Sequence, residues 1–198
     1  MNEILPGLYH WTVRHEGIGL DVSSYFVAGP RVLIDPMLPA ENLDWFRDDR
    51  EPELIVLTNR HHYRKSGEFV EAFGCRVLCH ESGLHEFEGG PEVQGFSTGD
   101  ELADGIVALE MGAICPDDSV LRIAVGKGAL AFADALMNWG GKVGFVPDSL
   151  MDDPPKVKEG VRESARRLLD ESFDALLFAH GDPIPVGGRA LLESFLSG

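Results

Sequence analysis

Several short apolar runs in this chain end abruptly in a polar residue, and this pattern constrains the fold more than any other feature. The run "VLID" ends at Asp35, "IVLTN" at Thr58 and Asn59, "LAFAD" at Asp134 and "LLFAH" at His180. Short runs of branched and aromatic residues bounded by Gly, Pro, Asp or Asn predict β-strands. In α/β sheets, ligands gather beyond the carboxyl ends of the strands. We therefore expect these polar residues to line one edge of a layered structure.

Helical patterns alternate with the later strand patterns. Helices are predicted near residues 66–74, 156–170 and 187–197, and the segment "ENLDWFRDD" predicts a further short one. The mixture indicates an α/β (α+β) protein whose sheets are covered by helices. The sequence of 198 residues has no internal linker or repeat, so one domain over residues 1–198 is expected.

The net charge limits the partners that the protein is expected to bind, and the cysteine content indicates its cellular compartment. The net charge of −16 predicts a surface that repels nucleic acids and anionic lipids. Three cysteines, an odd number, favour a reducing compartment over a disulfide framework. No apolar stretch approaches the roughly 20 residues of a membrane helix, and the first residues lack the pattern of a signal peptide. We expect a cytoplasmic protein.

The segment "LTNRHHYRKSGEF" carries a resemblance that extends over most of the chain. A strand pattern, a polar loop and a glycine-containing turn into a helix follow one another here. This order resembles the signature of the metallo-β-lactamase superfamily, in which a strand leads into Thr-His-x-His-x-Asp-His. The segments "VLIDP", "GAICPDDSVL", "ALAFADAL" and "LLFAHGDP" resemble that superfamily's other motifs in the right order. The resemblance implies an αββα sandwich of two mixed β-sheets flanked by helices.

Most metal ligands of that superfamily are replaced. In the frame of the resemblance, Asn59 stands at the first histidine, Tyr63 at the motif aspartate, Arg64 at the next histidine and Ile114 at the middle one. Isoleucine cannot bind a metal, and a guanidinium repels one. A paired-metal site, and with it β-lactamase activity, is not expected.

Three ligands remain in that frame: His61, Asp134 and His180. Two imidazoles and one carboxylate suit a single zinc, iron or manganese ion. The same residues also suit a hydrogen-bonded polar cluster without metal. Both interpretations stay open at this point.

The polar loop supplies further candidates. His61, His62 and Arg64 are the candidate catalytic residues, with His62 as a possible general base because an imidazole titrates near neutral pH. The position of His62 in the frame is variable, which predicts a side chain turned towards solvent. The same frame gives Asn59, Arg60 and Tyr63 as candidate ligand-binding residues.

Arg64 prompts a separate hypothesis. Its guanidinium either points to solvent and pairs loosely with a surface acid, or binds Asp134 directly and so replaces the charge of a lost cation. Its remaining donors would then receive an anionic ligand.

Two functions fit these residues, and a structural or oligomeric role is a third alternative. The first is a hydrolase-like protein with an altered metal site, acting on a small ester, thioester or lactone. The second is a non-catalytic, metal-free protein that binds a small anionic metabolite. The sequence carries no direct mark of oligomeric state.

Overall fold

The first sheet holds seven strands whose order in space repeats their order in the chain. The computed structural model describes residues 1–198. The strands are β1 (Asn2–Leu5), β2 (Leu8–His15), β3 (Leu20–Val27), β4 (Val32–Ile34), β5 (Leu54–Val56), β6 (Arg76–His80) and β7 (Gln94–Phe96). Pairing is antiparallel from β1 to β4 and parallel from β4 to β7. The ends of β4 and β5 therefore meet at the same edge of the sheet.

The second sheet brings the C-terminal strand beside a strand from the middle of the chain. Its order is β14-β11-β10-β9-β8, formed by β8 (Glu101–Ala103), β9 (Ile106–Glu110), β10 (Ser119–Ile123), β11 (Ala129–Phe132) and β14 (Ala175–Phe178). Only β11 and β14 pair in parallel, so this sheet is also mixed. A separate hairpin joins β12 (Leu136–Asn138) and β13 (Val143–Phe145).

Alternation along the strands builds a core on each side of the first sheet. In β4, Val32 and Ile34 lie in a cluster shared with the second sheet. Leu33 between them packs with Phe46 and Phe69 on the opposite face. Successive strand side chains point to opposite faces, so a three-residue strand buried on both sides reads as one continuous apolar run.

The three α-helices lie where the sequence predicts them. They are α1 (Ser66–Phe73), α2 (Pro154–Leu168) and α3 (Gly188–Ser197). The segment "ENLDWFRDD" forms two 3-10 helices, η1 (Asn42–Phe46) and η2 (Asp48–Arg50), in place of one short helix. Three other 3-10 helices are η3 (Arg60–His62), η4 (Glu81–Phe87) and η5 (Asp148–Leu150).

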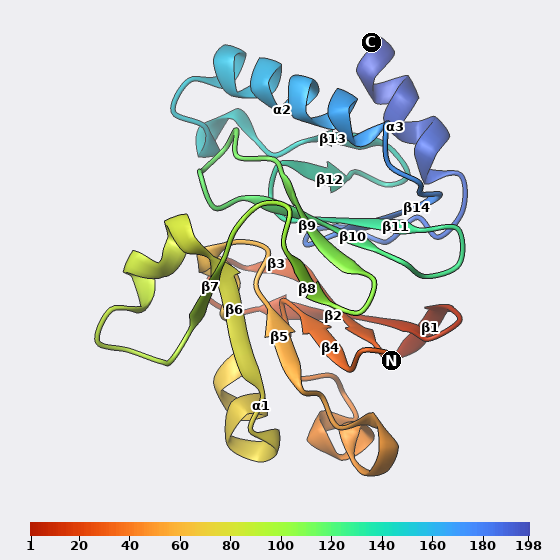
Figure 1. The fold of residues 1–198 in the computed structure, drawn as a ribbon. Helices are drawn as coiled ribbons and strands as arrows, with labels where there is room; N and C mark the ends of the chain where they lie inside the picture. Colours follow the sequence, from red (N-terminus) through yellow and green to blue (C-terminus); the bar gives the residue numbers. More distant parts are fainter.

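The layers follow from these faces. Figure 1 shows α1 below the first sheet and α2 and α3 above the second, with the two sheets between them. Residues of both sheets share one buried apolar cluster, which confirms face-to-face packing. The predicted αββα sandwich is confirmed. No helix combines the length and the apolar character needed to cross a membrane.

Candidate functional site

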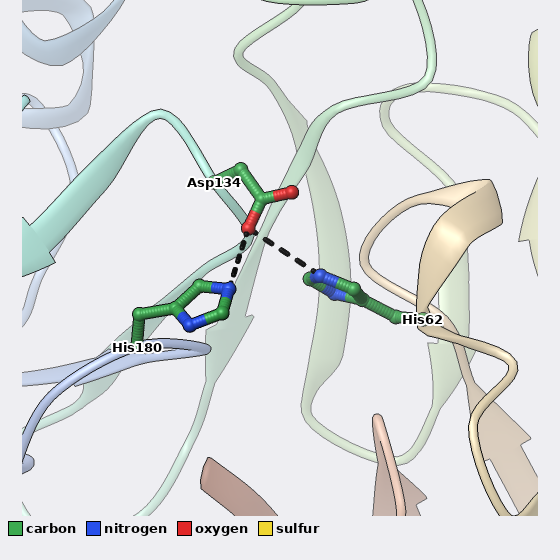
Figure 2. Close-up of side chains that lie close together, drawn as sticks. All are labelled: His62, Asp134 and His180. Atoms are coloured by element: carbon green, nitrogen blue, oxygen red, sulfur yellow. Dashed lines mark ion pairs between the residues drawn. The ribbon is translucent and has the colours of Figure 1, made fainter. Parts of the chain in front are cut away.

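Polar residues from both sheets converge at one edge of the sandwich. His62 comes from η3 after β5, Asp134 follows β11 and His180 follows β14. Figure 2 shows the two imidazoles pointing at the same carboxylate oxygen. One ligand atom from each residue lies within 4.8 Å of the others. Parallel pairing of β11 with β14 brings Asp134 and His180 to one sheet edge.

A capped 3-10 turn positions His62. The Asn59 side chain accepts a hydrogen bond from the amide of His61, across 2.9 Å, and so caps η3. The His62 ring then turns inward, where its Nδ1 lies 3.0 Å from Oδ2 of Asp35. Thr58 donates to the same carboxylate from its amide (2.8 Å) and from its hydroxyl (2.5 Å). Asp35 therefore fixes the orientation of the imidazole, as carboxylates do behind metal-binding histidines.

The geometry around Asp134 fits a single metal ion. Its Oδ1 lies 3.4 Å from Nε2 of His62 and 3.3 Å from Nε2 of His180. Both distances exceed the usual N–H···O range of about 2.7–3.2 Å, and Oδ1 is buried without a hydrogen-bond donor. Two ligand atoms bound at about 2.0–2.1 Å to one tetrahedral ion lie about 3.3–3.4 Å apart. Two histidines and one carboxylate suit iron, manganese or zinc.

The charges in this group shift one another's pKa values. Burial alone would lower the pKa of His62, but the carboxylates of Asp35 and Asp134 outweigh burial and raise it to about 9. Burial also opposes ionisation of Asp134, yet the two imidazoles hold its pKa well below the usual value. The pKa of Asp35 is lowered as well, because His62 and Arg64 overcome its burial. Without a metal, His62 is an imidazolium between two carboxylates.

Asp118 is a third acidic residue in the group, and the sequence interpretation missed it. Its Oδ1 accepts a hydrogen bond from the amide of Asp134, across 3.1 Å, while its Oδ2 is buried without a partner. Burial, together with the charge of Asp134, raises the pKa of Asp118 to about 8. The signal for this residue was the pair of aspartates directly before the buried strand β10 in "CPDDSVL".

The frame of the resemblance places the wrong histidine of the pair in the site. It predicts His61 beside Asp134 and His180, but the side chain of His61 is exposed to solvent. It predicts that His62 faces solvent, but His62 is buried and takes that place. Consecutive residues of a 3-10 turn diverge by about 120°, so only one of two adjacent histidines can point inward.

The other candidates of the polar loop divide between the site and its surroundings. Asn59 lies in the site, where it donates to Asp134 across 2.8 Å. Arg60 binds Asp117 through both its amide (2.7 Å) and its guanidinium. Tyr63 packs beside Phe87, with ring centroids 5.8 Å apart. These contacts give Arg60 and Tyr63 structural roles, and their part in ligand binding stays a prediction.

Arg64 does not bind Asp134, so that hypothesis is wrong. The guanidinium donates to the backbone carbonyls of Ser23 (2.6 Å) and Asp35 (2.8 Å). Arg64 and Asp35 both have positive φ, of 45° and 48°, a conformation that is uncommon for residues other than glycine. Arg64 therefore braces the strained backbone beneath His62.

Comparison with solved structures identifies the fold. The chain is similar to metallo-β-lactamase family protein TTHA1429 from Thermus thermophilus, with a TM-score of 0.69 and 20% identity over 98% of this chain and 80% of that one. It is similar to the superfamily protein ST1585 from Sulfolobus tokodaii, with a TM-score of 0.67 and 14% identity over 96% and 85% of the two chains. It is also similar to TTHA1623, which was solved in a di-iron-bound form, with a TM-score of 0.67 and 23% identity over 90% of this chain and 96% of that one.

These likenesses show that the chain has the metallo-β-lactamase fold. No protein-family model matches the sequence, and no curated protein does.

Proposed function

We propose that this protein is a metallo-β-lactamase-fold hydrolase with a single-metal site formed by His62, Asp134 and His180. The observation that carries the proposal is the approach of both imidazoles to Oδ1 of Asp134, at 3.4 Å and 3.3 Å. Without a metal, this buried oxygen has only the two long contacts with the imidazoles, beyond the usual hydrogen-bond range, and a poorly satisfied buried acceptor is costly. A metal ion at this point would satisfy it.

Each residue has a separate part in the proposed reaction. A metal in this site would polarise a carbonyl oxygen and acidify a water molecule. Asp35 holds the Nδ1 proton of His62 and leaves Nε2 free to act as a ligand. Asn59 holds Oδ2 of Asp134, which leaves Oδ1 towards the imidazoles. The substrate class proposed is a small ester, thioester or lactone, because such carbonyl compounds react under this chemistry.

A second candidate function is metal-free binding of a small anionic metabolite. The charge of the group favours the metal-free state. The raised pKa of His62, about 9, supplies an imidazolium between Asp35 and Asp134, and the Arg64 guanidinium lies beside Asp35. These two cations balance the two carboxylates without any metal ion.

Metal analysis separates the two candidates. The full chain is purified without chelator and without a metal-affinity tag, and its metal content is measured by mass spectrometry of the digested protein. The first proposal requires about one iron, manganese or zinc per chain, lost in His180→Ala and kept in His61→Ala. His61→Ala is the matched control, because His61 is the exposed neighbour of the proposed ligand.

Activity is then assayed on short-chain esters, a thioester and a lactone. Stoichiometric metal with chelator-sensitive hydrolysis supports the first candidate. If the protein holds no metal after incubation with each of the three ions, the first candidate is overturned and the second remains.

A further inference from the structure

A cavity of about 470 Å³ lies beside the residues that position His62. One wall is the end of β2 and the turn after it, and the other comes from the segments that follow β4 and η3. Its walls combine three apolar residues with charged and polar ones: Val13, Met37 and Leu38, then Arg14, His15, Glu16, Arg64 and Lys65, with Gly17 completing the set. Binding sites for small molecules have volumes of about 300–1,000 Å³, and this cavity lies in that range.

The charge of the cavity contrasts with that of the chain. Three permanent cations, Arg14, Arg64 and Lys65, face one acid, Glu16, in a protein whose net charge is −16. The ion pair of Arg14 with Asp21 is long, at 3.5 Å, and both side chains are about two-thirds exposed. Lys65 pairs with Glu68 at the surface. Exposed ion pairs contribute little to stability, so both cations are available to an anion.

Two buried polar atoms of the lining residues lack partners. Arg64 uses one terminal nitrogen for the carbonyls of Ser23 and Asp35, while its other terminal nitrogen is buried without an acceptor. Nδ1 of His15 is also buried without a partner. A buried donor of a charged group needs an acceptor. An oxyanion supplies acceptors to a guanidinium in a planar, two-pronged geometry.

We propose that this cavity binds the carboxylate or phosphate group of a small organic anion. Arg14 and Lys65 bind the oxyanion, the buried guanidinium of Arg64 adds its positive charge, and the apolar side chains of Val13, Met37 and Leu38 contact the rest of the molecule. The site is separate from the His62 group and does not rest on a bound metal. Arg64 connects the cavity to the His62 group. Its guanidinium donates to the backbone carbonyl of Asp35, and the carboxylate of Asp35 contacts His62.

The test measures binding of inorganic phosphate and of citrate to the full chain by titration calorimetry, with chloride keeping the ionic strength constant. We expect saturable binding of at least one probe with one site per chain, and the preferred probe tells a phosphate site from a carboxylate site. The double variant Arg14→Ala/Lys65→Ala is expected to bind about tenfold more weakly or worse. Both side chains are exposed, so the variant is expected to fold.

The matched control is Lys127→Ala/Arg166→Ala, which removes the same charge from exposed positions outside the cavity and should leave the affinity within about twofold. Absence of saturable binding by either probe would overturn the proposal, and so would equal weakening in both double variants. His180→Ala is expected to keep the affinity for the anion. If it abolished binding while Arg14→Ala/Lys65→Ala did not, the anion would bind at the His62 group, and the proposed cavity site would be wrong.

Discussion

Asn59 donates a hydrogen bond from Nδ2 to Oδ2 of Asp134, across 2.8 Å, and thereby decides which carboxylate oxygen faces the imidazoles. The same side chain caps η3 through its oxygen. Where the resemblance implies a metal-binding histidine, this chain has an amide that orients the carboxylate of Asp134. Asn59 thus lies in the site, as the histidine of the resemblance would, but it binds a neighbouring side chain instead of a metal ion.

Replacing Asn59 should reveal both tasks. Asn59→Ala removes the donor to Asp134 and the cap of η3, and we expect a loss of about 2 kcal/mol in the free energy of unfolding. Asn59→Asp keeps an acceptor for the cap but places a second carboxylate against Asp134. At pH 7 it should therefore lower the free energy of unfolding by more than Asn59→Ala does. Urea denaturation measures both. Equal stability of Asn59→Ala and the parent would contradict this role.

Two neighbouring serines of β3 should protect two different loops. Ser23 donates from its amide to the carbonyl of Ala179 (2.9 Å) and from its hydroxyl to that of Gly181 (3.1 Å), on either side of His180. Ser24 donates to the carbonyl of Asp35 across 2.7 Å.

Hydrogen exchange followed by mass spectrometry can separate these two contacts. Ser23→Ala should speed exchange about tenfold in the peptide that spans residues 179–182, and Ser24→Ala should do so in the peptide that spans 35–38. Each variant is the control for the other. The same pattern of exchange in both variants would contradict the separate roles.

Arg64 should matter for stability through its contacts with the backbone and through its charge beside Asp35. Arg64→Ala removes the donors to the carbonyls of Ser23 and Asp35, and we expect a loss of about 3 kcal/mol. Arg47→Ala is the control, because Arg47 is exposed and pairs only with Asp44, a contact worth at most about 1 kcal/mol. Chemical denaturation of both variants near pH 7 tests this. Losses of similar size would refute the bracing role.

The buried His10 predicts how stability responds to acid. Burial lowers its pKa to about 4, although Asp182 partly opposes the shift. The unfolded chain takes up this proton near pH 6.5 and the folded chain only near pH 4, so the contribution of His10 is complete above about pH 6.5 and is lost as the pH falls towards 4.

We expect this loss to reach about 2 kcal/mol, measured as the difference in unfolding free energy between pH 7 and pH 4.5. His10→Gln does not titrate and retains a polar group for Ser23, so its pH dependence should be flatter than that of the parent. Parallel curves for the two proteins would contradict the assignment.

The fold could be predicted from the sequence because its signals are local and repeated. Each buried strand, such as β4, β5 and β14, is a short apolar run with a polar end. The helix α1 ends at Gly74, whose φ of 70° suits glycine. The order of these elements indicated sheets covered by helices, and the resemblance to the metallo-β-lactamase superfamily added that there are two sheets packed as a sandwich.

The site was predicted only in part because its details depend on the direction of single side chains. Asp134 and His180 follow strands of the same sheet, so their proximity follows from the topology. The choice between His61 and His62 depends on one residue of register in a 3-10 turn, and a sequence frame does not fix that register. The role of Asp118 depends on its burial and on its contact with the amide of Asp134, and the aspartate pair before β10 does not by itself show which of the two takes that role.

The order of strands in the first sheet has a consequence for folding. Because β1 to β7 pair only with their neighbours in the chain, this half closes short loops and can assemble from the N-terminus onwards, during synthesis. The second sheet is completed only when Ala175 reaches Ala129 and pairs β14 with β11. His180 follows that strand, so the histidines can meet only after nearly the whole chain has been made. Premature termination would thus leave a half-built sandwich with an exposed apolar face and no assembled site.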